Sequence, residues 1–140
     1  MSIKVTFHGQ SCFQFEQGEH SLLVDPFFTD NPVAKCSAEN ISCTHIAVTH
    51  GHFDHFADCE GIAKANNATV YAAFEICDYL GEQGHEQCEP GNPGGRITAP
   101  FGSISFTSAF HSSSFKGRYM GEPCGLMIEF EGAVIYHAGD

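Results

Sequence analysis

The segment Thr49-His50-Gly51-His52-Phe53-Asp54-His55 places three histidines and one aspartate within six consecutive positions. Neutral imidazole and carboxylate are side-chain groups that zinc, iron and manganese accept as ligands. The apolar residues 46–48 before this segment predict a buried strand, and residues 58–65 after it predict a short helix. The ligating side chains therefore lie on a strand-to-helix loop. The alternative is a His-rich surface loop with only adventitious metal affinity.

Side-chain spacing within the segment indicates how the ligands divide between ions. His50 and His52 are two residues apart in extended chain, so both point to the same side and can reach one metal ion. Asp54 and His55 follow the turn into the helix and can address a second ion nearby. We predict one or two divalent ions per chain, with zinc first and manganese or iron as alternatives.

Hydrophobic patterning elsewhere predicts the rest of the fold. Strands are expected at residues 4–7, 12–15, 21–24, 46–48, 69–71, 104–106, 126–128 and 133–136, and short helices at residues 58–65 and 74–80. Strands that alternate with two helices and end in hairpin strands predict an α/β fold, a mixed sheet layered with helices. No internal repeat or linker divides residues 1–140, which we interpret as a single domain.

Composition and charge disfavour several classes of protein. The 140-residue chain is 42% hydrophobic yet has no long apolar run, so no transmembrane helix is expected. Its first residues lack the apolar core of a signal peptide. Six basic against seventeen acidic residues give a net charge of −11, which disfavours nucleic acid or an anionic membrane as a partner.

The cysteines indicate the cellular compartment. Their number is seven, which is odd, and no two of them have the two-residue spacing of a zinc knuckle or a thioredoxin-like motif. Several lie inside apolar runs, as Cys12 and Cys77 do. We interpret them as thiols of a protein in the reducing cytoplasm.

Four further motifs, together with the Thr49–His55 loop, resemble the metallo-β-lactamase superfamily. These motifs are Gly9-Gln10-Ser11-Cys12-Phe13, Val24-Asp25-Pro26-Phe27, Ala109-Phe110-His111-Ser112-Ser113-Ser114 and Ile135-Tyr136-His137-Ala138-Gly139-Asp140. Within the superfamily they are similar to metal-dependent hydrolases related to ascorbate-6-phosphate lactonase. The resemblance runs along the chain but covers only the first part of the family's pattern. It implies the N-terminal part of an αβ/βα sandwich, in which two sheets face each other with helices outside.

The resemblance also implies a ligand set for the first ion. It places the family's third ligand at His111, so that His50, His52 and His111 hold metal one. A lone histidine after a strand is otherwise most often a structural side chain with its hydrogen bonds satisfied. The three serines at 112–114 either line a substrate pocket or simply form the loop, and the sequence leaves both alternatives open.

For the second ion, the resemblance implies Asp54 and His55 as ligands and Asp140 as a carboxylate that bridges both ions. Asp25 is expected to touch neither ion and to hold a ligand histidine in the correct tautomer. Without the resemblance, Asp140 is an ordinary turn residue and Asp25 a strand-ending aspartate before proline. His137 is interpreted as structural, because strand alternation points it away from the neighbours of Asp140.

These assignments predict a metal-dependent hydrolase that uses a metal-bound hydroxide on an ester, lactone or phosphoester of a small-molecule substrate. Asp54 is the catalytic candidate, because its carboxylate can orient the hydroxide as well as ligate. No nucleophilic side chain is required, which agrees with the lack of a Ser-His-Asp or Cys-His signature. The alternative is a non-catalytic metal-binding fragment or assembly module that kept metal one and lost turnover.

The chain departs from the family in two places. It ends at Asp140, before the second half that supplies further strands, helices and a final histidine for metal two. We therefore expect one apolar sheet face to be left uncovered, and association with a second copy or with a complementing chain. Gln10 stands where the relatives usually carry histidine, so no role is assigned to that position.

Overall fold

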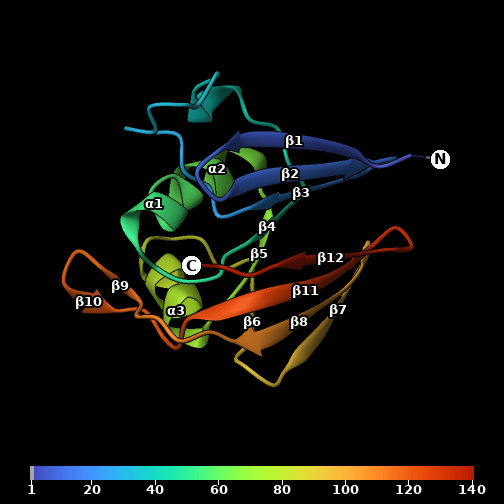
Figure 1. Ribbon diagram of the computed structural model, residues 1–140. Helices are drawn as coiled ribbons and strands as arrows, with labels where there is room; N and C mark the ends of the chain where they lie inside the picture. Colours follow the sequence, from blue (N-terminus) through green and yellow to red (C-terminus); the bar gives the residue numbers. More distant parts are fainter. Residues whose placement is uncertain (1) are drawn as a thin grey trace.

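Two β-sheets face each other in the computed structural model, which describes residues 2–140 (Figure 1). The first sheet has the strand order β1-β2-β3-β4-β5-β6. Its strands are β1 (Lys4–Gly9), β2 (Cys12–Gln17), β3 (His20–Val24), β4 (His45–Ala47), β5 (Thr69–Ala72) and β6 (Cys88–Pro90). Strands β1 to β3 pair antiparallel, whereas β3 to β6 pair in parallel. The predicted mixed α/β architecture is therefore confirmed.

The second sheet is antiparallel, in the order β12-β11-β8-β7. Its strands are β7 (Arg96–Ala99), β8 (Gly102–Ser108), β11 (Cys124–Phe130) and β12 (Ala133–His137). Between β8 and β11 the chain leaves the sheet to form a short hairpin of β9 (Ser114–Phe115) and β10 (Arg118–Tyr119). The connection from β8 into this hairpin carries His111.

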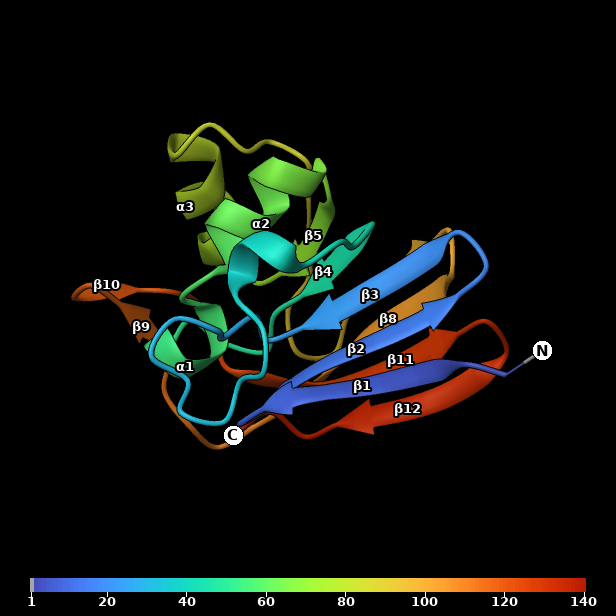
Figure 2. The ribbon, with the colours of Figure 1, turned by 90° about the horizontal axis from the view of Figure 1, so that it is seen from above.

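Helices pack against one face of the first sheet. They are the 3-10 turn η1 (Ala38–Asn40), α1 (Phe53–Phe56), α2 (Cys59–Asn66) and α3 (Phe74–Glu82), and Figure 2 shows α2 and α3 beside β4 and β5. Leu23 of β3 packs in a buried cluster with Ile62 and Ile76 of these helices. Its neighbour Leu22 packs with Leu126 of the second sheet, because successive side chains of a strand point to opposite faces. Within residues 2–140, no helix is both long and apolar enough to span a membrane.

Most predicted elements lie where patterning placed them, with boundaries shifted by a few residues. The helix predicted over residues 58–65 is α2, which ends at Asn66 because Asn67 adopts a left-handed conformation with φ 52°. The prediction of two helices was incomplete, since α1 begins at Phe53, inside the predicted metal loop Thr49–His55. Strands β6, β7, β9 and β10 were also missed: β6 contains a proline, β7 directly follows the glycine- and proline-rich residues 91–95, and β9 and β10 have only two residues each.

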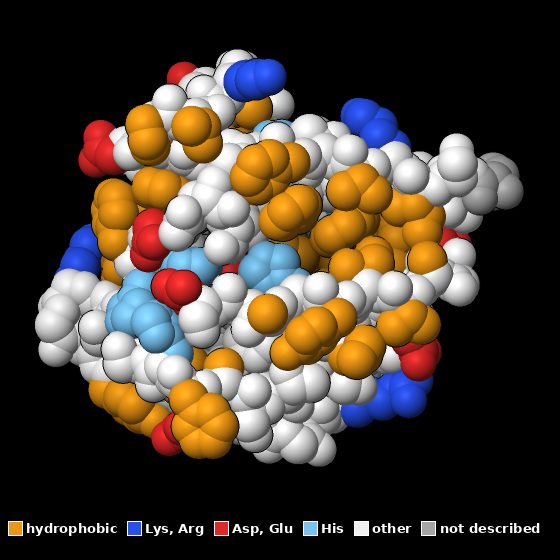
Figure 3. Space-filling model, viewed as in Figure 1, with side chains coloured by type: hydrophobic (Ala, Val, Ile, Leu, Met, Phe, Trp, Pro, Cys, Tyr) orange, Lys and Arg blue, Asp and Glu red, His pale blue; other side chains and the backbone are white. Residues whose placement is uncertain are grey.

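Apolar side chains remain exposed on β1 and β12, each of which is an edge strand of its sheet. Phe7 of β1 is 60% exposed and Tyr136 of β12 is 59% exposed, and Val5 and Val134 on the same strands are exposed as well. Figure 3 shows hydrophobic side chains gathered along the junction of the two sheets. Exposed apolar side chains therefore lie on these two edge strands, whereas an uncovered sheet face and a partner that covers it stay predictions.

Candidate metal centre

The Thr49–His55 loop leaves the first sheet at the end of β4 and is fastened to the loop that carries His111. Gly51 N donates a hydrogen bond to Ser113 Oγ at 2.9 Å, and this hydroxyl donates in turn to the Met120 carbonyl oxygen at 3.3 Å. A Cβ atom on Gly51 would lie 2.5 Å from Met120 Cβ, so only glycine permits this approach. Two segments some sixty residues apart in sequence are thereby held side by side.

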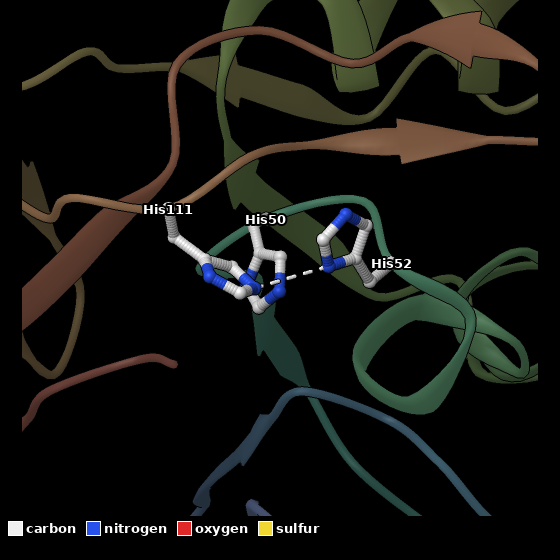
Figure 4. A group of neighbouring side chains, drawn as sticks. All are labelled: His50, His52 and His111. Carbon is white, nitrogen blue, oxygen red and sulfur yellow. Dashed lines mark hydrogen bonds between the residues drawn. The ribbon is translucent and has the colours of Figure 1, made fainter.

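The three histidines predicted for metal one converge at this junction. One ring nitrogen from each of His50, His52 and His111 lies within 4.8 Å of the others, and Figure 4 shows the three rings turned toward a common space. His52 Nδ1 and His111 Nε2 are 3.2 Å apart. Two imidazole nitrogens at that distance repel each other unless a proton or a cation lies between them. The arrangement therefore fits a cation held by this first cluster.

Asp140 joins the first cluster to a second one. Asp54, His55 and Asp140 also offer ligand atoms within 4.8 Å of one another. Asp140 Oδ2 lies 3.5 Å from His55 Nε2 and 3.4 Å from His111 Nε2, so one carboxylate oxygen stands between the two clusters. Asp54 Oδ2 lies 3.7 Å from His55 Nε2. The structure thus brings together all six residues predicted as metal ligands.

Asp25 organises the histidines from behind. It is fully buried, and its Oδ2 accepts hydrogen bonds from His55 Nδ1 at 2.8 Å and from the Thr49 hydroxyl at 2.7 Å, while Oδ1 accepts from Thr49 N at 2.8 Å. Asp25 lies close enough to His50 and His55 to share a metal ion with them. Its oxygens already accept the three hydrogen bonds above, however, so they are poorly placed to bind metal. Its position agrees with the predicted role of fixing a ligand tautomer.

Thr49 extends this control to a second histidine, a role that sequence reasoning missed. Its hydroxyl proton goes to Asp25, so its oxygen accepts the proton of His50 Nδ1 at 2.9 Å. Both His50 and His55 therefore carry their ring proton on Nδ1 and present an Nε2 lone pair. These two Nε2 atoms are buried and have no hydrogen-bond partner among the described residues. Buried lone pairs of this kind are what a metal ion would satisfy.

The environments of these two histidines shift their pKa values in opposite directions. Burial, with the nearby His55, lowers the pKa of His50 to about 4, which keeps its imidazole neutral and able to ligate. Burial also acts to lower the pKa of His55, but the hydrogen bond and charge of Asp25, helped by Asp54 and Asp140, outweigh it and raise the pKa. The carboxylates around His55 therefore make the second cluster the more negatively charged of the two.

Other polar side chains at the site were not anticipated or were left open. Ser112 Oγ lies 3.1 Å from His52 Nε2, so Ser112 supports a ligand ring, and Ser113 fastens the Gly51 loop. Gln10, to which no role was assigned, donates its side-chain amide to Asp54 Oδ2 at 2.8 Å. His137 donates from Nε2 to the Ser11 carbonyl oxygen at 2.8 Å, in keeping with a structural role. The sequence indicated the structural role of His137 and left the serines open, whereas it gave no signal for the contact of Gln10.

Each cluster combines one buried histidine with two ligands that reach solvent. His50 and His55 are buried, whereas the side chains of His111, Asp54 and Asp140 are 31%, 41% and 48% exposed. Figure 3 shows histidine and acidic side chains together on one open surface of the molecule. Both carboxylates are therefore accessible from solvent in the described residues.

Comparison with known proteins agrees with this site. The model of the β-lactamase superfamily domain matches residues 20–140. A UPF0173 metal-dependent hydrolase from Staphylococcus carnosus (strain TM300) is 44% identical over 144 residues, which cover 99% of this chain and 63% of that protein. The metallo hydrolase Igni18 from Ignicoccus hospitalis KIN4/I is 33% identical with a TM-score of 0.84, over 99% of this chain and 60% of that one. CmlA, a diiron β-hydroxylase from Streptomyces venezuelae, shares the fold at 16% identity and a TM-score of 0.73, over 97% of this chain and 29% of that one.

The chain spans less than two thirds of the length of the hydrolases it matches. The narrower resemblance to ascorbate-6-phosphate lactonase stays a prediction. The matched family model nonetheless contains the Thr49–His55 loop, His111 and Asp140, which are the parts of the sequence that form both clusters. The chain therefore belongs to the metallo-β-lactamase superfamily.

Proposed function

We propose that this chain carries the metal-binding and catalytic part of a metal-dependent hydrolase that acts on an ester, lactone or phosphoester bond. One observation carries the proposal: the Nε2 atoms of His50 and His55 are buried without a hydrogen-bond partner among the described residues, and the Asp140 carboxylate lies 3.5 Å from that of His55. A structural role does not explain two buried lone pairs without donors. Hydrolases are also what the most similar relatives reported above are named.

The donor set suggests how the site would be loaded. His50, His52 and His111 would hold one divalent ion, and Asp54 and His55 a second, with Asp140 shared between them. When bound, such ions supply an activated water near neutral pH and polarise the attacked carbonyl or phosphoryl oxygen. Zinc suits three imidazoles best, with manganese or iron as alternatives. Seven free thiols within the described residues are compatible with our proposal of a reducing, cytoplasmic location.

The chain's own residues would act mainly through position. Asp25 keeps His55 in one tautomer directly and His50 through Thr49, so neither ring needs to reorient during turnover. Asp54 is the solvent-open carboxylate of the second cluster that is not shared with the first, so it can orient the attacking water and accept its proton. Solvent-exposed Asp54 and Asp140 leave room for a substrate above the clusters.

Metal analysis combined with a hydrolysis assay tests the proposal. Purified protein reconstituted with zinc should hold up to two ions per chain and hydrolyse at least one of three probes, a p-nitrophenyl ester, a lactone and a phosphodiester. His50→Ala should abolish the activity. His85→Ala is the matched control, because His85 is a buried histidine that bonds the Ala68 carbonyl oxygen away from the site. One ion with no turnover of any probe would instead support a non-catalytic metal-binding module.

A further inference from the structure

The turn between β1 and β2 contacts the second cluster from two sides. Gln10 Nε2 donates a hydrogen bond to Asp54 Oδ2 at 2.8 Å. The next residue, Ser11, accepts a hydrogen bond through its carbonyl oxygen from His137 Nε2 at 2.8 Å, and His137 Nδ1 accepts from Gly139 N at 3.2 Å. Both carboxylates of the second cluster, Asp54 directly and Asp140 through its preceding backbone, are thus tied to one hairpin turn.

This turn is held in a fixed place by its neighbours. Gly9 has φ 105°, and a Cβ atom there would lie 2.4 Å from Val33 Cγ2. Asn31 donates its side-chain amide to the Phe27 carbonyl oxygen at 2.9 Å and approaches the His8 carbonyl oxygen at 3.5 Å. The β1–β2 turn therefore lies against the loop after β3 and cannot shift without disturbing both.

Gln10 itself adopts a backbone conformation that disfavours its side chain. Its φ is 56°, in the left-handed region that glycine or asparagine occupies at lower energy. The side chain is exposed, so packing does not explain the choice of glutamine. Five other non-glycine residues of the described chain share a left-handed φ, Glu131 of the β11–β12 turn among them, so the side-chain contact of Gln10 rather than its backbone marks it out. The contact that this residue makes is the one to Asp54.

We propose that Gln10 is a positioning residue that orients the Asp54 carboxylate for the second metal ion, an inference that rests on the proposed function. An amide N–H on Oδ2 fixes the rotation of the carboxyl group and leaves Oδ1 and the remaining lone pair of Oδ2 free to ligate. The amide is neutral over the whole working pH range, so it orients the carboxylate without competing for a proton or adding charge. An exposed hydrogen bond contributes little to folding by itself, so the effect should fall on metal binding rather than on stability.

Two substitutions separate the amide from the backbone. Gln10→Met removes the donor and keeps a long side chain in the left-handed conformation, whereas Gln10→Gly removes the donor and relieves the backbone. Metal-free protein titrated calorimetrically with Zn²⁺, and with Co²⁺ followed by visible absorption, reports the two binding events separately. We expect both variants to bind the first equivalent as the unaltered protein does, and the second roughly tenfold more weakly. The thermal midpoint of metal-free Gln10→Gly should be unchanged or higher.

Glu131→Gly provides the matched control. Glu131 also has a left-handed φ, 48°, in the hairpin turn between β11 and β12, at the other end of β12 from Asp140. It should leave both binding events unchanged. Unaltered second-ion affinity in Gln10→Met, or recovery of that affinity in Gln10→Gly alone, would overturn the proposal.

The outcomes also keep this inference distinct from the proposed function. Protein that binds a single ion yet hydrolyses a probe would overturn the role of Gln10 and leave the hydrolase standing. Two ions with the predicted loss in both variants, but no hydrolysis of any probe, would support the role of Gln10 and count against the hydrolase.

Discussion

The two candidate metal-binding clusters contain different ligand types and are supported in different ways. The first consists of His50, His52 and His111, with His50 buried and its tautomer set through Thr49. The second contains two carboxylates that are nearly half exposed, and one of them is held by a side chain from a distant hairpin turn. We infer that the first cluster is the preformed, tight site, and that substrate arrives at the second, whose two carboxylates are open to solvent.

Loss of a first-cluster ligand should have the largest effect. His50→Ala should lower the affinity for the first ion by more than about 100-fold, because changes even to residues behind a ligand lower metal affinity by about 10–100-fold. Calorimetric zinc titration measures this, with His85→Ala as control. If the second ion alone were lost, the assignment of His50 to the first cluster would be wrong.

Asp25→Asn should lower the metal affinity of both clusters, by roughly 10–100-fold each. The reason is that Asp25 sets the tautomer of His55 directly and that of His50 through Thr49. Asp58→Asn is the matched control, since the Asp58 carboxylate likewise accepts backbone and side-chain hydrogen bonds, from Phe28 N, Thr29 N and the Thr29 hydroxyl, but belongs to neither cluster. A loss confined to one ion would show that the two clusters are supported independently.

The pH dependence of folding should distinguish a buried histidine outside the clusters from those within them. Burial, with the nearby His20, lowers the pKa of His45 from 6.5 to about 4. Its neutral form therefore stabilises the fold fully above pH 6.5, and this contribution is lost as the pH falls toward 4.

Between pH 7.5 and pH 5 the loss from His45 amounts to about 2 kcal/mol. Urea unfolding of the metal-free protein measures the free energy of unfolding at each pH. The fall in this free energy between pH 7.5 and pH 5 should be smaller by this amount in His45→Gln than in the unaltered protein. Added zinc should leave the His45 contribution unchanged, because His45 does not belong to either cluster. An equal fall in the free energy of unfolding in both proteins would contradict a lowered pKa of His45 in the fold.

Ser112→Ala should have the smallest effect. Ser112 Oγ supports His52 Nε2 from the exposed side of the first cluster, so water can replace the hydroxyl. We expect the first ion to bind about two- to tenfold more weakly, as for loss of one hydrogen bond, and the second ion to bind unchanged. A loss as large as that of His50→Ala would show that the first cluster is less preformed than we infer.

Much of this protein follows from local sequence. The ligand types at positions 50 to 55 and the alternation of apolar residues along β1, β2 and β3 are properties of adjacent residues, and they predicted the metal loop and most strands. Resemblance then supplied His111, Asp140 and Asp25. The structure brings these together, because the Gly51–Ser113 contact fastens the two loops and the parallel strands β3 and β4 end side by side.

What tertiary structure alone decided is the support of these ligands. The hydrogen bonds from Thr49 to Asp25 and from Gln10 to Asp54 join residues 24 and 44 positions apart, and no local pattern encodes them. A hydrogen bond depends on where folding places donor and acceptor, whereas ligand chemistry depends on the identity of the side chain. The sequence alone therefore identifies the Thr49–His55 loop as metal-binding, and the tertiary structure determines which nitrogen and which oxygen each ligand can offer.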